Sequence, residues 1–543
     1  MEEVADGHPF LGNPYFIEHK DDMPPAFFLA DWFAAIPLLL GMSLMHTALL
    51  DFFIWSYIFL LLVYLLLRVL DLPARWSLAG SVLAFLSVYM HMIRPVSMQE
   101  IYPFFLLFLI AFVFWLREPT RIKRIYFVAL SAALTAYIYT YAWQVVIVVF
   151  LLTPLAFWFT ARRQYLRSFF FMFSVFVLAS LPLMLFTWVQ VHTPFYFETL
   201  QRIGLVNTHL PASAVVSSCI WIPTMFFLWY ILSRVNSAVT LKEKEGVAFL
   251  FFVLTGTAMV VVTLSNIITG KELELPQHIE RFTILWLSFA SVYSVYFFAN
   301  NRSSKKLALG YFFTGTLLVG LIFYGNLRYL LTYGPLDAFA PVDKISEIKI
   351  QELAKPLSWL NENIQDQSVV WADPDGQLNR YITMMTKHYV LFYAGGPLHI
   401  LSNKESEERY LTAHYFSLSE TGLENDYWAY GGVGNAVHQW KTHNRVVRVC
   451  KVLQYDYWWH PCGELVDRVS WKGKSYFEGL YSEFKDRVQP NIVEELRKYH
   501  VSYIVRDMVL DTPTFHPELI PSTKLVYADD RFMIYRFVLP NKP

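Results

Sequence analysis

Apolar residues dominate the first 325 positions of the chain, in runs that are separated by short polar connections. A helix needs roughly 20 apolar residues to cross a bilayer, and shorter spans are tolerated inside a bundle. On this basis the pattern predicts ten membrane-spanning helices. Their predicted ranges are 48–70, 77–92, 101–116, 125–140, 145–159, 169–191, 214–233, 247–268, 281–299 and 307–325.

The connections between these helices differ in charge. Taken alternately, one set of connections contains 15 Lys and Arg residues and the other set contains three. Cytoplasmic loops of membrane proteins are rich in Lys and Arg, so the basic set is predicted to face the cytoplasm. The residues before 48 and after 325 are then expected on the outer face of the membrane.

The first 47 residues raise a question of orientation, because residues 1–25 are polar and contain no recognisable signal peptide. Either residues 26–46 cross the membrane as an eleventh span, or a helix upstream of Met1 is absent. A span over 26–46 would place Asp31 in the hydrocarbon. We therefore expect an amphipathic helix at the outer interface, with Asp31 in water. Its lipid-facing residues would be Phe28, Phe33, Ile36, Leu39 and Leu40.

The character of the sequence changes near residue 343, where charged residues become frequent. Short apolar runs such as SVVWA and VSYIVRD alternate there with helix-like stretches, which predicts an α/β domain with at least one βαβ element. The fold class expected is a helical membrane bundle followed by this domain. The predicted organisation is an outer loop with an interfacial helix (1–47), a transmembrane bundle (48–325), a linker (326–343) and an extracytoplasmic α/β domain (344–543).

Composition agrees with a membrane protein, because 55% of the residues are hydrophobic and only 16% are charged. The net charge is zero, so no long-range field favours nucleic acid as a partner. Cys450 and Cys462 would be able to pair in an oxidising compartment, although their spacing does not establish the geometry. The glycine-rich stretches lack the spacing of a nucleotide-binding loop.

Ionisable residues near the predicted outer face are the main candidates for chemistry, because burying charge in a membrane is costly. Asp21 and Asp22 follow His19 in the first loop. Two adjacent carboxylates can act as a general base or hold a divalent cation, for which Mg²⁺ or Mn²⁺ would be expected. The alternative for this stretch is a solvated turn before Pro24.

Two further outer connections carry candidates. Arg94, Gln99 and Glu100 lie in RPVSMQE, where they can read a phosphate or a sugar hydroxyl. The alternative is a snorkelling arginine beside a helix cap. His278 and Arg281 are three residues apart at a helix start, so they share a face that points to the lipid phosphates. Interfacial anchoring is the alternative for this pair.

The longest outer connection, 192–213, contains Arg202 among several aromatic residues. A long loop with aromatic side chains suits a lid or a surface on which a sugar stacks, and the alternative is an interfacial helix. The residues expected to bind lipid phosphate or substrate are therefore His19, Arg94, Gln99, Arg202, His278 and Arg281.

This layout resembles the GT-C superfamily of polytopic membrane glycosyltransferases. The resemblance rests on a polar first outer loop, about eleven helices, the junction RPVSMQE, a late outer loop with His278 and Arg281, and an outer α/β tail. The tail stretches KPLSWLNENIQDQSVVWADPDG, VSYIVRD and DRFMIYRF are similar to those of bacterial members described as dolichyl-phosphate-mannose-mannosyltransferase-like.

The resemblance implies transfer of a sugar from a polyprenyl-phosphate-linked donor to a glycan, lipid or protein acceptor. It also implies a bacterial plasma-membrane location with the C-terminal domain outside. In this superfamily the catalytic carboxylate lies in the first outer loop, and VADGHPFLGNPYF resembles the part downstream of it. The matching Asp would therefore fall before Met1. Asp21 and Asp22 are then substitutes argued from chemistry, and Glu100 is the candidate second acidic position.

Two other functions fit the same pattern. A transporter or flippase of a lipid-linked substrate would also have many helices, although such proteins tend to show internal repeats that are not visible here. A non-catalytic membrane-anchored module is the third interpretation. A liposome assay distinguishes a transporter or flippase from a glycosyltransferase, because transport moves the substrate without forming a glycosidic bond.

Overall fold

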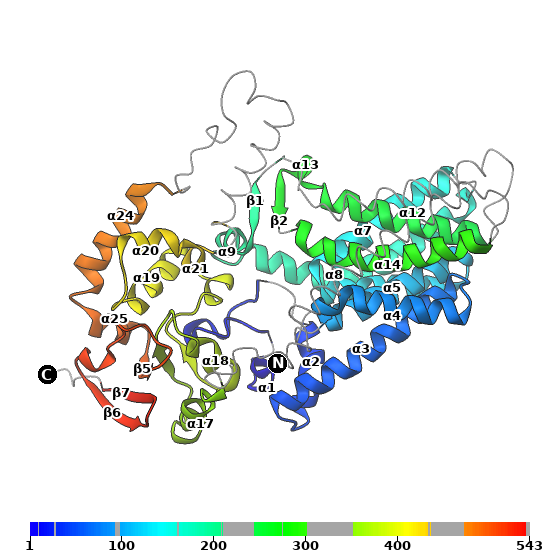
Figure 1. Ribbon diagram of the computed structural model, residues 1–543. Helices are drawn as coiled ribbons and strands as arrows, with labels where there is room; N and C mark the ends of the chain where they lie inside the picture. Colours follow the sequence, from blue (N-terminus) through cyan, green and yellow to red (C-terminus); the bar gives the residue numbers. More distant parts are fainter. Residues whose placement is uncertain are drawn as a thin grey trace, which may run out of the picture. The chain divides into compact units, whose positions relative to one another are not determined.

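Figure 1 shows the computed structural model of the protein, which divides into two compact units. The helical unit contains Ala26–Trp188 and His209–Val342, and the sheet unit contains Glu2–Pro25, Val189–Thr208 and Asp343–Pro543. The residues that the structure describes are 1–8, 10–25, 29–92, 98–159, 162–207, 209, 244–273, 275–300, 351–432, 435 and 472–538.

Eight of the ten predicted spans coincide with helices of the structure, and the remaining two, 214–233 and 307–325, lie outside the described residues. The eight helices are α3 (Leu44–Val69), α4 (Ala74–Met92), α5 (Met98–Arg117), α6 (Ile122–Ile138), α7 (Thr140–Phe159), α8 (Leu166–Val191), α12 (Lys244–Thr263) and α14 (Leu275–Asn300). Shorter elements are α2 (Leu29–Leu39), η2 (Arg163–Tyr165), α13 (Asn266–Thr269) and β2 (Lys271–Leu273).

Among the described residues, five helices are long and apolar enough to cross a bilayer. They are Leu44–Val69, Met98–Arg117, Thr140–Phe159, Arg163–Val191 and Gly246–Thr269. These helices indicate a membrane protein, as the sequence predicts. The number of ten spans stays a prediction.

Helix α5 lies at the centre of the helical unit. Its apolar segment is 83% buried, whereas that of α3 is only 22% buried although the two helices pack together. Phenylalanine rings fill the space around α5, and the Phe105 ring lies 4.7 Å from that of Phe282 on α14. A helix that is apolar all round belongs in such a buried position, whereas α3 leaves one side free to face lipid.

The predicted interfacial helix is present as α2, and it packs against α3 and α5. Three alanines form its buried face: Ala30, Ala34 and Ala35. Ile36, Leu39 and Leu40 are exposed, as expected of residues that face lipid. Phe33 differs from the prediction, because its ring packs 5.2 Å from Phe104 and 6.5 Å from Trp55. The small alanine side chains bring α2 close enough to the bundle for this contact.

The sheet unit is built on a five-stranded sheet in the order β4-β3-β5-β7-β6. Strand β3 is parallel to β4 and β5, whereas β7 is antiparallel to β5 and β6. Because α18 connects β3 to the parallel β4, the predicted βαβ element is confirmed. The strands are β3 (Val369–Ala372), β4 (Tyr389–Val390), β5 (Val501–Asp507), β6 (Thr523–Ala528) and β7 (Phe532–Phe537).

Helices cover both faces of this sheet, and every residue of β3 is buried. Trp371 contributes to one core and Val370 to the other, as expected for alternating side chains of a covered strand. The helical elements of the unit are α1 (Glu2–Ala5), η1 (Ile17–His19), α9 (Tyr196–Ile203), α17 (Ala354–Asn363), α18 (Leu378–Met385), η4 (Gly396–Leu398), α19 (Asn403–Ala413), α20 (Glu420–Asn425), α21 (Tyr427–Tyr430), α24 (Lys474–Glu483), η6 (Phe484–Val488), α25 (Ile492–Lys498) and η7 (Pro517–Leu519). Strand β1 (Leu205–Asn207) follows α9.

Residues 2–25 fold with the C-terminal part of the chain rather than with α2, so the predicted outer segment 1–47 is divided between the two units. The Val390 amide on the edge strand β4 donates to the Tyr15 carbonyl at 2.9 Å. The Asn13 side chain accepts hydrogen bonds from the amides of Tyr15 and Phe16, which shapes the turn. This segment therefore covers a strand edge that would otherwise expose unpaired backbone groups.

Candidate functional site

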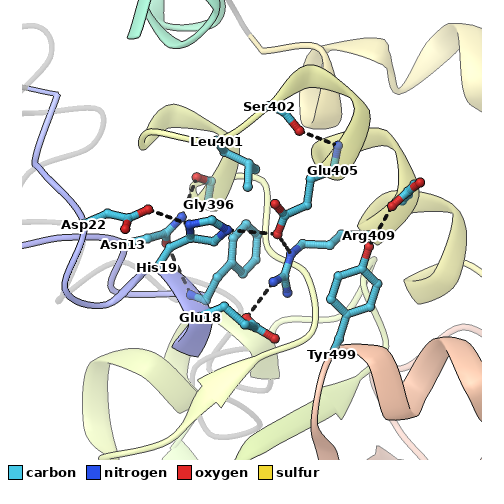
Figure 2. Close-up of polar contacts among 12 residues, drawn as sticks. Asn13, Glu18, His19, Asp22, Gly396, Leu401, Ser402, Glu405, Arg409 and Tyr499 are labelled. Carbon is cyan, nitrogen blue, oxygen red and sulfur yellow. Dashed lines mark hydrogen bonds and ion pairs between the residues drawn. The ribbon is translucent and has the colours of Figure 1, made fainter. Parts of the chain in front are cut away.

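The predicted loop residues enter a network of charges in the sheet unit (Figure 2). His19 lies between two carboxylates: its Nδ1 is 2.6 Å from Asp22 and its Nε2 is 3.0 Å from Glu405 on α19. A neutral imidazole carries only one N–H, so only the protonated ring can donate to both carboxylates. The loop is thus attached to the sheet unit by a charged histidine.

Glu405 also pairs with Arg409, which is the centre of the same network. Arg409 is fully buried, and its Nη2 donates to Glu18 in the loop at 2.6 Å while its Nε donates to Glu405 at 3.0 Å. Figure 2 shows these residues converging from the loop and from α19. Acidic and basic side chains therefore alternate through the network, in the order Asp22, His19, Glu405, Arg409 and Glu18.

The candidate carboxylates Asp21 and Asp22 face different histidines. Asp21 is 2.9 Å from His8 and has a largely exposed side chain, whereas Asp22 bonds to His19. Among the described residues, no three His, Cys, Asp or Glu side chains gather in an arrangement that would hold a metal ion. Both carboxylates contact histidines of their own segment, and their predicted roles as a general base or as metal ligands stay predictions.

The network shifts the ionisation of its members. Burial disfavours the charged form of His19, but its hydrogen bonds to Asp22 and Glu405 outweigh burial and raise the pKa of His19 to about 9. Burial likewise opposes ionisation of Glu405. The hydrogen bond that Glu405 accepts from His19, together with the positive charge of Arg409, outweighs burial and lowers the pKa of Glu405 to about 2. Both groups are therefore charged at neutral pH.

We expect the loop to be released when His19 loses its proton. The folded-state pKa of His19 lies above its ordinary value of 6.5. The stability that the His19 contacts give the folded loop is therefore complete below about pH 6.5 and is lost as the pH rises through about 9. Glu405 limits the stability of the folded loop at acid pH, because its stabilising contribution is lost as the pH falls from about 4.5 through about 2. Proteolysis within residues 10–25 should increase between pH 7 and pH 9.5.

The histidine can be tested against a matched control. His19→Gln should remove most of this pH dependence, whereas His516→Gln should leave it intact, because His516 pairs with Glu518 on the surface and does not touch the loop. An unchanged pH profile in His19→Gln would show that another group controls the loop.

Arg202 was predicted to bind substrate, but its guanidinium is occupied by the protein. It is fully buried on α9, with Nε 2.7 Å from the Pro397 carbonyl and Nη1 2.5 Å from the Asn403 side chain. Nη2 donates to three more acceptors: the Thr199 hydroxyl and the carbonyls of His399 and Leu401. Arg202 therefore fixes the segment that leads into α19, and a phosphate would have to displace these bonds.

The helical unit contains the other candidates. Gln99 and Glu100 begin the central helix α5 and are almost completely buried, at 1% and 0% exposure. A carboxylate in such a position is costly to ionise unless other groups stabilise it, and this cost makes it a functional candidate. Arg94 lies outside the described residues.

His278 and Arg281 lie one turn apart near the start of α14, as predicted. The His278 ring stacks on Tyr141 at 4.2 Å, and its Nδ1 forms a hydrogen bond with the Tyr139 hydroxyl. The Tyr102 hydroxyl on α5 donates to the Arg281 carbonyl at 3.3 Å. This bond joins α5 and α14 near their N-terminal ends, which carry Glu100 and Arg281.

Sequence reasoning missed the partners of the candidate residues. Glu405 and Arg409 have the spacing of a helical ion pair, which is readable in the sequence, but their contacts with residues 18 and 19 are not. Tyr139 falls inside the predicted span 125–140 and Tyr141 in the connection after it, and neither was singled out from the sequence. Asp51, near the start of α3, is only 3% exposed, and its Oδ2 has no hydrogen bond among the described residues.

The candidates thus form two groups. His19, Asp21, Asp22 and Arg202 belong to the sheet unit, and Gln99, Glu100, His278 and Arg281 belong to the helical unit. A scan of the chain against protein-family models finds no match, and a search of curated proteins finds no similar sequence.

The helical unit thus has a carboxylate, Glu100, and an arginine, Arg281, near the N-terminal ends of α5 and α14. A buried carboxylate can remove a proton from a hydroxyl, and an arginine fork can bind a phosphate through two parallel hydrogen bonds. The predicted Cys450–Cys462 pair lies outside the described residues.

Proposed function

We propose that the protein is a multi-pass glycosyltransferase that moves a sugar from a polyprenyl-phosphate-linked donor to an acceptor at the outer face of the bacterial plasma membrane. The observation that carries this proposal is the buried Glu100 at the start of α5, a helix whose Tyr102 hydroxyl donates a hydrogen bond to the backbone carbonyl of Arg281 near the start of α14. The resemblance of the sequence layout to the GT-C superfamily supports the same class of reaction.

In this proposal Glu100 is the general base and Arg281 binds the lipid phosphate. Glu100 takes the proton of an acceptor hydroxyl, whose oxygen forms a bond to the anomeric carbon of the sugar. The bond between that carbon and the phosphate oxygen breaks, and the polyprenyl phosphate leaves with the electron pair. Arg281 stabilises the negative charge that develops on this leaving group.

His278 completes the proposed phosphate site. Its ring is held by the stacked Tyr141 and by the Tyr139 hydroxyl, so its second nitrogen has a fixed direction. A second function has one observation in its favour, because a buried carboxylate within a span, such as Asp51, also occurs in transporters. A transporter or flippase of a lipid-linked substrate is therefore the alternative.

A proteoliposome assay distinguishes these functions. The full chain is reconstituted with a polyprenyl-phosphate-linked, radiolabelled hexose and with membrane lipids or glycans as acceptors. Transfer predicts a new labelled glycoside together with free polyprenyl phosphate. Movement of the intact donor across the bilayer without a glycoside would support the transporter and overturn the proposal.

A further inference from the structure

Helix α9 turns polar residues towards the protein and phenylalanines away from it. Its two fully buried positions are Thr199 and Arg202. Phe197 is 52% exposed, and Phe195, which directly precedes the helix, is 49% exposed. An amphipathic helix of a globular protein in water buries its apolar stripe and exposes its polar residues. The polarity of α9 is therefore inverted, with an arginine inside and two aromatic rings outside.

The buried side of α9 is bound to the segment that leads from η4 into α19. The Thr199 hydroxyl donates to the His399 carbonyl at 3.2 Å, and the Glu198 side chain accepts a hydrogen bond from the Asn403 amide at 2.7 Å. The guanidinium of Arg202 donates to acceptors of the same segment. Because these bonds fix the rotation of the helix, α9 cannot turn its phenylalanines inwards without losing them.

The backbone of Phe195 also indicates a role other than packing. Its φ is +63°, in the left-handed region that favours glycine and asparagine over residues with large side chains. An exposed ring gains little packing energy that would compensate for this conformation. Residues held in sparsely populated backbone conformations cluster at functional surfaces.

The place of α9 in the chain indicates what meets these rings. Helix α8 belongs to the stretch Arg163–Val191, which is long and apolar enough to cross a bilayer, and Phe195 follows four positions after Val191 (Figure 1). Four extended residues cover at most about 14 Å. The interfacial layer on each side of the hydrocarbon is about 5–8 Å thick. The rings are therefore within reach of the lipids that surround the end of α8.

Charge distinguishes two ways of binding lipid. Residues 192–203 contain Arg202 as their only Lys or Arg, and that side chain is fully buried. Attraction to anionic headgroups depends on basic residues near the membrane surface. Contact through aromatic side chains that enter the boundary between headgroups and acyl chains needs no such charge. The segment thus fits a phospholipid surface of any headgroup charge.

We propose that α9 is an interfacial anchor, in which Phe195 and Phe197 insert among the lipids at the membrane surface where α8 ends. Thr199 and Arg202 hold the helix to the sheet unit at the same time. The sheet unit thereby has a contact with lipid of its own, in addition to its covalent connection to the spans. This inference goes beyond the proposed sugar transfer and does not depend on it.

The test uses the full chain in proteoliposomes of phosphatidylcholine that carries a photoactivatable diazirine in its acyl chain. Mass spectrometry with fragmentation locates the labelled residues after illumination. The comparison segment is 517–522, where Leu519 is 69% exposed but no span adjoins it in the sequence. We expect labelling of residues 195–203 to exceed that of 517–522 about tenfold to a hundredfold, as burial of two half-exposed rings in lipid predicts.

A double variant tests whether the rings draw the helix into lipid. Phe195→Asn with Phe197→Ser removes both rings, and asparagine adopts the left-handed conformation readily. Lipid labelling of the unaltered residues 198–203 should fall about tenfold or more, because the apolar surface that enters the lipid is lost. Leu519→Ser is the matched control and should leave this labelling unchanged. The unfolding midpoint of both variants should equal that of the unchanged protein, since the replaced side chains are exposed.

Several outcomes would overturn the anchor. One is equal labelling of the two segments in the unchanged protein, and another is full labelling of residues 198–203 in a folded double variant. If the double variant unfolds more easily, the ratio of labelling in the unchanged protein decides. Replacing half of the phosphatidylcholine with phosphatidylglycerol should leave the labelling unchanged, so a severalfold increase would assign the contact to charge. Cross-links between two copies of the chain at 195–203, in place of lipid adducts, would assign this surface to a second copy.

Discussion

Replacing Arg281 with alanine is expected to reduce sugar transfer by about 10²- to 10³-fold, as does removal of a single group that stabilises a developing negative charge. Arg281 lies near the start of α14, and its backbone carbonyl already accepts a hydrogen bond from Tyr102 on α5. The substitution leaves this backbone bond intact and removes only the charge. Initial rates of glycoside formation at saturating donor measure the effect.

Two further variants give this prediction its controls. Arg281→Lys keeps the positive charge but loses the fork, so its rate should fall between those of alanine and arginine. Arg121→Ala removes an exposed arginine from the connection between α5 and α6, where it pairs with Glu118, and should leave the rate unchanged. Full activity in Arg281→Ala, at equal amounts of inserted protein, would refute the phosphate role.

Replacing Arg202 with methionine is expected to destabilise the sheet unit by about 3–5 kcal/mol, the cost of removing one partner from a buried charged network. The carbonyls of Pro397 and Leu401 would lose a hydrogen bond inside the protein, and methionine offers no donor to replace it. Such a change lowers the unfolding midpoint by about 10 °C in a unit of this size.

A surface arginine provides the comparison. Arg497→Met removes an arginine that pairs with Glu494, whose side chain is 62% exposed, and pairs of this kind contribute about 0–1 kcal/mol. Thermal unfolding of the full chain in detergent, followed by the exposure of buried tryptophans such as Trp371, measures both variants. Equal midpoints for the two variants would contradict the structural role of Arg202.

The periodicity of apolar residues predicted most of the elements correctly. Eight predicted spans fall on helices of the structure, and VSYIVRD forms β5 over Val501–Asp507. These predictions succeeded because the length and the composition of an apolar run are local properties. A helix that crosses a bilayer needs a long apolar run, and a strand covered on both faces needs a short one. Phe33, which was expected to face lipid, is half-buried against Phe104 on α5, a contact that the local sequence does not indicate.

The candidate site was predictable only as a set of residue types. The spacing of His278 and Arg281 on one helix face is a local property, and the structure has the two residues one turn apart on α14. The interpretation of Arg202 as a substrate ligand used its position in a loop with aromatic residues. Apart from the Thr199 hydroxyl, its acceptors lie about 200 residues further along the chain, from Pro397 to Asn403, where no local pattern indicates them.

The sequence by itself determined that this is a membrane protein with a separate α/β region, because hydrophobic length and alternation are encoded residue by residue. Only the tertiary structure decided that the polar residues 2–25 fold with the C-terminal region. Glu18 and His19 acquire their partners Arg409 and Glu405 nearly 400 positions away. Ion pairs of this kind depend on distance in space, which the order of residues along the chain does not specify.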